Sequence, residues 1–141
     1  MSTNNVQQLI SDYARNHESR YLAPDATFTI MTTGDRWEGR QAIENALTWL
    51  YHQAFEAHAD VTDLVVEGDK AAVELVFRGR HTGEFFGIDP TGREVNVPFC
   101  IVYHLSGDQI TAAHIYLEMS TLVHQISSGP PSSQPPQWPG D

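Results

Sequence analysis

The sequence predicts an α+β fold in which about three helices lie on one face of a curved antiparallel sheet. The first observation is a change of hydrophobic period: apolar residues recur at helical spacing before about residue 55 and alternate at strand spacing after it. The second is that the later strands follow one another through short turns, which is typical of hairpins. Helices that are separate from a run of antiparallel strands indicate the α+β class.

The chain has the size and composition of one globular domain. Its 141 residues are 40% hydrophobic and 10% aromatic, which suits a folded core. We expect the domain to span residues 1–127 and a Pro- and Ser-rich tail to follow over residues 128–141. The tail has the composition of a disordered or polyproline II segment.

Charge and cysteine content restrict the partners and the compartment. A net charge of −10, with 8 Lys and Arg residues, argues against nucleic acid and anionic membrane surfaces as partners. No apolar run approaches the ~20 residues that cross a bilayer, and the first residues lack the pattern of a signal peptide. Cys100 has no second cysteine to pair with, so we expect a cytoplasmic location and a buried, unreactive thiol.

Helical spacing defines the first part of the chain. One apolar face near the start comprises Val6, Ile10, Tyr13 and Ala14. A short helical turn is predicted at residues 19–22, where Pro24 ends it. Residues 40–55 form the clearest helix. Its apolar stripe comprises Ile43, Leu47, Leu50 and Ala54.

Strands and a last helical turn make up the rest. Residues 26–33 are rich in β-branched and aromatic side chains and predict a strand with a short returning partner. Two hairpins follow, with turns at residues 67–69 and 106–107, and their long strands include residues 71–83 and 95–105. "MSTLVHQI" predicts a terminal helical turn.

Two stretches carry a resemblance to a known family. They are "GRHTGEFFGIDPTGREVNVP" and "GDQITAAHIYLEMSTLVHQI". Both resemble the SnoaL-like polyketide cyclase (ester cyclase) family, which belongs to the nuclear-transport-factor-2-like, cystatin-like superfamily. "LAPDATF" and "WEGRQAIENAL" are similar to the first half of the family, so the resemblance covers roughly residues 6–126.

The resemblance implies a fold and one candidate residue. The fold is a cone, with a bent antiparallel sheet wrapped around helices and a deep apolar pocket between them. In the cyclases, the acid near the end of the last strand is the general acid and base of an intramolecular aldol ring closure. The matching position is Glu118, where the cyclases carry Asp. The same fold hosts isomerases, dehydratases, hydrolases and binders, so it does not specify the reaction.

Strand parity predicts that Glu118 and His81 converge at the pocket mouth. Residues two apart in a strand share a face, so His81 ends the core-facing row of one strand. The predicted core-facing row of the last strand comprises Ile110, Ala112, His114, Tyr116 and Glu118. A carboxylate walled by aromatic rings loses hydration, so its pKa rises and it can take a proton from carbon. A neutral imidazole can donate a hydrogen bond to the enolate oxygen. We therefore predict Glu118 and His81 as catalytic residues.

Further side chains are predicted to line the pocket, with the two adjacent phenylalanines as its roof. They are His114, Tyr116, Trp37, Tyr51, Phe77, Phe85 and Phe86. Structural roles stay open, because His81 can bind a backbone carbonyl and Glu118 can cap the last helix. We expect no metal site, since no recognised ligand spacing occurs. His17 is among the histidines that we place on the surface or at an interface.

The leading prediction is a cofactor-independent enzyme, similar to a cyclase or isomerase, that performs general acid–base chemistry on an apolar small molecule. A non-catalytic binder of such a molecule, or a dehydratase or hydrolase on the same scaffold, are the alternatives. We also expect a homodimer. The reason is that Pro98, Cys100 and Val102 make the outer face of one strand too apolar for water alone.

Overall fold

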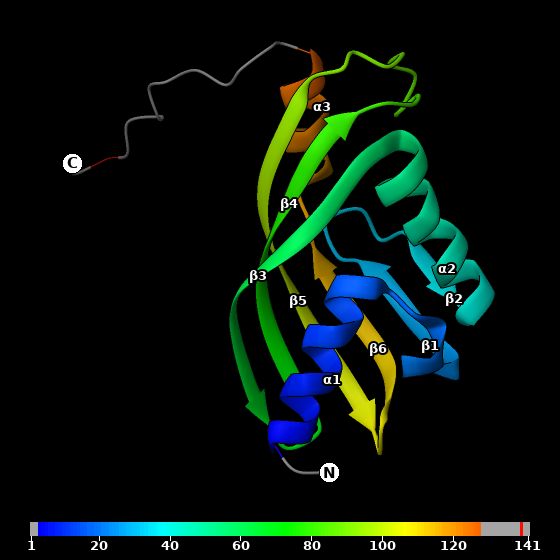
Figure 1. Ribbon diagram of the computed structural model, residues 1–141, viewed down its shortest axis with the longest axis vertical. Helices are drawn as coiled ribbons and strands as arrows, with labels where there is room; N and C mark the ends of the chain where they lie inside the picture. The colour runs from blue at the N-terminus through cyan, green and yellow to red at the C-terminus, as the bar shows by residue number, and fades with distance from the viewer. Residues whose placement is uncertain (1–2, 128–138, 140–141) are drawn as a thin grey trace.

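The chain begins with an amphipathic helix, α1 (Thr3–Asn16), in the computed structural model, which describes residues 3–127 and Pro139 (Figure 1). The predicted apolar face is confirmed, since Val6, Ile10, Tyr13 and Ala14 are all buried. The elements that follow are η1 (Ser19–Tyr21), β1 (Leu22–Ile30), β2 (Arg36–Glu38), α2 (Arg40–Thr48), η2 (Trp49–Ala54), β3 (Phe55–Glu67), β4 (Lys70–His81), β5 (Glu94–Ser106), β6 (Gln109–Tyr116) and α3 (Met119–Ser127).

Six strands form one unclosed sheet in the order β2-β1-β6-β5-β4-β3. Neighbouring strands are antiparallel except β1 and β6, which run parallel. The α+β class with a curved sheet is confirmed, and the parallel pair makes the sheet mixed rather than wholly antiparallel. Tight turns dictate the direction of consecutive strands, whereas β1 and β6 lie far apart in the sequence and no turn joins them.

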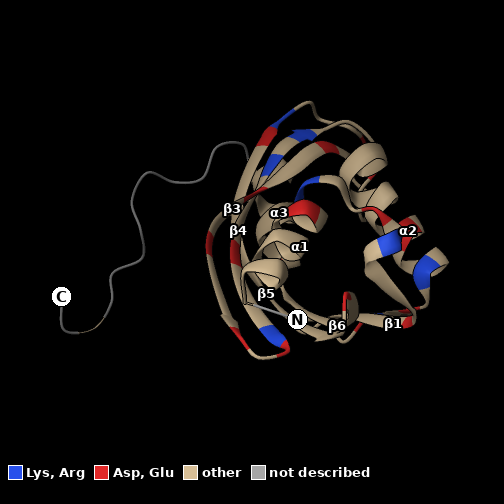
Figure 2. Ribbon diagram, turned by 60° about the horizontal axis from the view of Figure 1, so that its bottom comes forward, with Lys and Arg blue, Asp and Glu red and all other residues tan. Residues whose placement is uncertain are grey.

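The sheet curves around the helices, and Figure 2 shows α1 and α3 in its hollow. Helix α1 packs on β3 and β4, and α3 packs on β5. Helix α2 packs on β1 and β2 and so covers the other end of the sheet. The core therefore lies between the concave face of the sheet and these helices.

Strands β4 and β5 alternate as the sequence predicts. On β4 the buried row includes Val73, Leu75, Phe77 and His81, and the alternate positions are exposed or half-buried. On β5 the outward positions are those predicted: Pro98 is exposed, and Cys100 and Val102 are half-buried. Regular pairing along both strands keeps the side-chain period at two.

Strand β6 does not alternate as predicted, because its pairing with β5 contains a register shift. Leu105 pairs with Ile110 while His104 pairs with Ala112, so Thr111 is an extra residue, and its hydroxyl donates to the carbonyl oxygen of His104 at 3.1 Å. An extra residue makes every later side chain of the strand point to the opposite face of the sheet. The buried positions after the shift are Ala113, Ile115 and Leu117. The predicted core-facing row through Ala112, His114, Tyr116 and Glu118 is therefore wrong.

The predicted helix over residues 40–55 divides into α2 and a π-helical turn, η2. Ile43, Leu50 and Ala54 of the predicted stripe are buried, and Leu47 is half-buried. A π-helical turn is uncommon and is frequent at functional sites.

Apart from Pro139, the tail falls outside the described residues, so its predicted disordered or polyproline II character is not tested. Within the described part of the chain, no helix has both the length and the apolar character that crossing a bilayer requires.

Candidate functional site

An apolar cavity lies between the concave face of the sheet and the helices, with a volume of about 50 Å³. The residues that line it come from α1, β1, β2, α2, η2, β5, β6 and α3. His17, which follows α1, and Leu117, which follows β6, line it as well. Among the described residues, none that lines it is Asp, Glu, Lys or Arg. The polar groups among its lining residues are the imidazole of His17, three tyrosine hydroxyls and two indole N–H groups, from Tyr13, Tyr51, Tyr103, Trp37 and Trp49.

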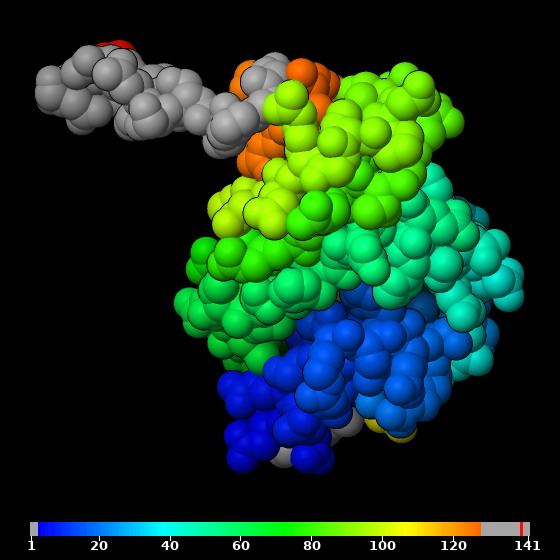
Figure 3. Space-filling model, turned by 45° about the horizontal axis from the view of Figure 1, so that its top comes forward, coloured from blue at the N-terminus to red at the C-terminus, as the bar shows by residue number. Residues whose placement is uncertain are grey.

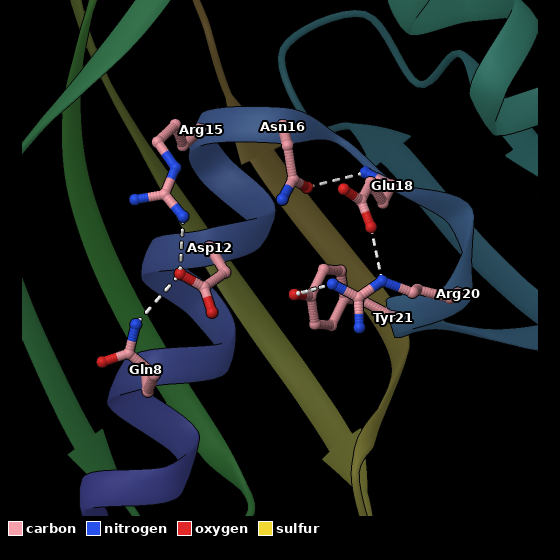
Figure 4. A network of polar contacts seen from close by, with 7 residues as sticks. All are labelled: Gln8, Asp12, Arg15, Asn16, Glu18, Arg20 and Tyr21. Carbon is pink, nitrogen blue, oxygen red and sulfur yellow. Dashed lines mark hydrogen bonds and ion pairs between the residues drawn. The ribbon is translucent and has the colours of Figure 1, made fainter.

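His17 enters this cavity from the end of α1. Its φ of 52° is left-handed, a conformation that non-glycine residues adopt rarely but in which His is enriched. Two hydrogen bonds hold this turn: the N–H of His17 donates to the oxygen of Tyr13 at 2.8 Å, and the N–H of Glu18 donates to Oδ1 of Asn16 at 2.9 Å. Figure 4 shows the Asn16 side chain reaching across to Glu18, whose carboxylate pairs with Arg20.

The imidazole of His17 is packed between two cavity rings. Its centroid lies 5.5 Å from that of Tyr13 and 4.6 Å from that of Tyr51. Burial, and then the nearby His52, lower the pKa of His17 from 6.5 to about 4. The imidazole is therefore neutral above about pH 5, so it can both accept a proton and donate a hydrogen bond. The ring also borders a polar groove on the outside, which Asn16, Glu44 and His52 line.

The tyrosines supply hydrogen-bond donors in the same wall. Burial raises the pKa of Tyr13, Tyr51 and Tyr103, so all three hydroxyls keep their protons at neutral pH. The rings of Tyr13 and Tyr103 meet edge to face at 6.3 Å. Tyr13 is 1% exposed, and its hydroxyl is one of the two buried side-chain polar atoms without a partner among the described residues. A buried hydroxyl without a partner is costly.

His81 lies elsewhere, so its predicted convergence with Glu118 in the main cavity is wrong. The side chain is fully buried against Phe55, with ring centroids 5.4 Å apart, and does not line the cavity. The N–H of Thr91 donates to its Nδ1 at 3.1 Å, so Nε2 carries the proton of the neutral ring. Nε2 is the second buried polar atom without a partner among the described residues. The ring thus anchors residues 82–93 rather than opening into the cavity.

Glu118 is exposed and does not line the cavity either. It precedes α3, where its carboxylate accepts a hydrogen bond from the hydroxyl of Ser120 at 3.1 Å. The register shift in β6 explains the difference, because it places Leu117 rather than Glu118 in the cavity wall. The position of Glu118 fits the structural alternative, in which an acid lies next to the N-terminus of the last helix.

The predicted pocket residues divide into three groups. Trp37 and Tyr51 line the cavity. Phe77 is buried behind Tyr51 at 5.1 Å, and Phe85 is buried against the cavity residue Trp49 at 5.5 Å. The rest face away from the core: Phe86 is 64% exposed, Tyr116 is 46% exposed, and His114 lies half-buried beside His104 on the outer face of the sheet. Contact with a substrate stays a prediction for Trp37 and Tyr51, and nothing in the cavity wall supports it for Tyr116 and His114.

The sequence did contain a signal for His17. Its position continues the buried face of α1, since it lies four residues after Tyr13 and seven after Ile10. For metal ligands, the described residues contain no group of three or more His, Cys, Asp or Glu side chains that could hold an ion.

Fold and cavity together define a small α+β protein with an internal apolar cavity. The family model for SnoaL-like polyketide cyclases matches residues 6–126, so the chain belongs to that family. No curated protein matches it.

Solved structures show the same fold. A protein from Jannaschia sp. CCS1 that is assigned to the SnoaL-like polyketide cyclases has a TM-score of 0.81 and 18% identity, over 92% of this chain and 98% of that one. TsrD from Streptomyces laurentii has a TM-score of 0.75 and 21% identity, over 91% and 98% of the two chains. A protein with a ketosteroid isomerase-like fold from Catenulispora acidiphila DSM 44928, in complex with trimethylamine, has a TM-score of 0.71 and 19% identity, over 96% and 100%.

Proposed function

We propose that the protein is an enzyme that performs general acid–base chemistry on an apolar carbon acid, in an aldol-type cyclisation or an isomerisation. The observation that carries the proposal is the neutral imidazole of His17 in an apolar wall, packed between the rings of Tyr13 and Tyr51. The predicted role of general base thus moves from Glu118 to His17. Membership of a cyclase family supports the reaction class.

The site can supply both halves of a proton abstraction. The imidazole takes a proton from the carbon next to a carbonyl, the C–H electron pair moves into the new C=C bond, and the carbonyl oxygen becomes an enolate oxygen. A low pKa makes His17 a weak base, so the reaction depends on stabilising that enolate. The Tyr13 hydroxyl, protonated and without a partner, is the donor for it. Imidazolium then returns the proton to carbon in an isomerisation, or to the alkoxide of a closed ring.

A generic carbon acid tests this without knowledge of the substrate. In 5-nitrobenzisoxazole, removal of the C–H proton breaks the N–O bond and releases a coloured phenolate. We expect the wild-type rate to rise with pH through about 4 and to be flat above about pH 5, because only neutral His17 is active. His17→Asn, which tolerates the left-handed backbone, should lower kcat/KM at least ~100-fold. Glu118→Gln is the matched control and should stay within about twofold.

Two outcomes would contradict the proposal. Equal rates in the wild type and His17→Asn would remove the imidazole from the chemistry. A loss confined to Glu118→Gln would return the role of base to that carboxylate.

A non-catalytic binder of an apolar molecule is the second candidate, because so few polar groups stand in the cavity wall. Binding of apolar ligands with no turnover above that of the buffer would favour it.

We propose further that two copies of the chain pair through the outer face of β4, β5 and β6. Apolar or weakly polar residues meet there across the strands: Val76 pairs with Pro98, and Cys100 pairs with Tyr116. Tyr116 is 46% exposed in the single chain. Sedimentation should give a dimer at micromolar concentration and a monomer for Val102→Glu. A monomeric wild type would contradict this.

A further inference from the structure

The loop between β4 and β5 presents a phenylalanine in an unfavourable backbone conformation. The N–H of Phe85 donates to the oxygen of Ile88, and the N–H of Ile88 donates to the oxygen of Phe85, both at 3.0 Å. Phe86 and Gly87 are the two residues between them, with φ of 48° and 80°. Two positive φ values in a two-residue turn describe type I′, where Asn-Gly is favoured and a bulky residue in the first position is unfavourable.

Burial does not compensate for this conformation, because Phe86 is 64% exposed. Strained residues that persist without a packing gain are found mainly at ligand-binding and switch sites. The acidic side chains Glu84 and Asp89 are exposed on either side in the sequence. The surface around Phe86 is therefore unsuited to an anionic ligand.

Phe86 belongs to an aromatic row that leads into the cavity. Its ring meets Trp49 edge to face, with centroids 6.4 Å apart. Trp49 both lines the cavity and is 36% exposed, so it connects the interior with the surface. Phe85, which is fully buried, stacks on Trp49 at 5.5 Å and holds it in place. Figure 3 shows this loop, in light green, above the teal segment that contains Trp49.

The cavity is too small to enclose a whole ring-containing ligand, so such a ligand would also need an apolar surface outside it. Its volume of about 50 Å³ is well below the ~150 Å³ of an engineered cavity that holds benzene. Only a small end of a ring-containing molecule fits inside. The remainder must lie at the surface, and the apolar surface continuous with the cavity is that of Trp49 and Phe86.

We propose that Trp49 and Phe86 form an outer subsite for a flat, uncharged, apolar group of a ligand whose reactive end lies in the cavity. This rests on the proposed function, because it takes the cavity as the ligand site. In this subsite the flat group of the ligand stacks on the ring of Trp49, and the ring of Phe86 contacts the edge of that group. Aromatic rings favour both geometries.

Two neutral probes of different length test the subsite separately from the cavity. N-phenyl-1-naphthylamine is long enough to reach the outer subsite, and its fluorescence rises in apolar surroundings. Butanone is short enough to stay within the cavity, and NMR shifts of the cavity residues report its binding. The variant is Phe86→Asn, which restores the favoured Asn-Gly turn. The matched control is Val65→Asn, another exposed apolar residue, 62% exposed and near the far end of β3.

Phe86→Asn should weaken binding of the long probe at least ~5-fold, leave butanone binding unchanged and not lower the melting temperature. Val65→Asn should change neither binding. Unchanged binding of the long probe to Phe86→Asn would overturn the subsite, as would an equal loss for both probes. If neither probe binds the wild type, the cavity itself is not a ligand site and the proposed function fails with it. Unchanged probe binding together with reduced adsorption to neutral lipid vesicles would assign Phe86 to a membrane contact instead.

Discussion

Two histidines differ in what their surroundings allow them to do. His81 is fully buried at the end of β4, and its Nδ1 accepts the N–H of Thr91 while Phe55 covers the ring. His17 lies beyond the end of α1, and its ring faces a cavity on one side and a polar groove on the other. The first ring is enclosed by its own protein, whereas the second has space for a ligand. Burial alone therefore does not identify a functional histidine, and what matters is whether the ring borders open volume.

The largest effect is expected at the enclosed histidine. His81→Ala should lower the free energy of unfolding by about 4 kcal/mol, because it leaves a cavity and removes the acceptor for the N–H of Thr91. Urea denaturation measures this. His81→Gln keeps an acceptor and should lose less. A loss below about 1 kcal/mol for His81→Ala would mean that the ring does not anchor residues 82–93.

At the cavity, His17 should make stability depend on pH. Its pKa is about 4 in the folded protein and near 6.5 in the unfolded chain, so the unfolded chain binds the proton first as pH falls. The stability that neutral His17 contributes is present above pH 6.5 and is lost between pH 6.5 and 4, by about 3 kcal/mol. Below pH 4 both states are protonated and this loss ends.

The control is a variant that cannot titrate. Denaturation curves of His17→Asn between pH 4 and 6.5 should lack this part of the pH dependence. Identical slopes in the wild type and the variant would show that His17 is not desolvated.

Tyr13→Phe should change stability and activity in opposite directions. Removing a buried hydroxyl without a partner should raise the free energy of unfolding by about 1 kcal/mol. The same change should lower turnover of a carbonyl substrate by removing the enolate's donor. Thermal denaturation and the rate on that substrate check the two parts. A destabilised variant would show that the hydroxyl already has a partner in solution.

The smallest effect is expected at Glu118. Its carboxylate is exposed and bonds only locally, to Ser120. Glu118→Gln should change the free energy of unfolding by less than about 0.5 kcal/mol. A loss of 2 kcal/mol in urea denaturation would instead indicate a buried role.

Most of the fold could be predicted from the sequence, because local patterns determine it. The apolar face of α1 and the alternation in β4 and β5 follow from spacing alone. The parallel pair β1–β6 could not be predicted, since it joins segments that no turn connects. The family could be predicted as well, because its motifs stand in the sequence.

The site could be predicted only in part. Placing Glu118 depended on strict alternation through β6, and a single extra residue, Thr111, reverses it. That shift exists only through pairing with β5, so the sequence of β6 alone does not show it. His17 was not predicted to line the cavity, although its spacing from Tyr13 fits the buried face of α1, because it lies after the end of that helix and its backbone is left-handed.

The most direct test of the central claim is NMR titration of the two histidine rings, with and without an apolar ketone. If the cavity at His17 is the functional site, its ring should titrate near pH 4 in the free protein. Its resonances should shift when the ketone binds, while those of His81 should not. A His17 ring that titrates at its ordinary pKa of about 6.5 and does not respond to the ketone would contradict the account.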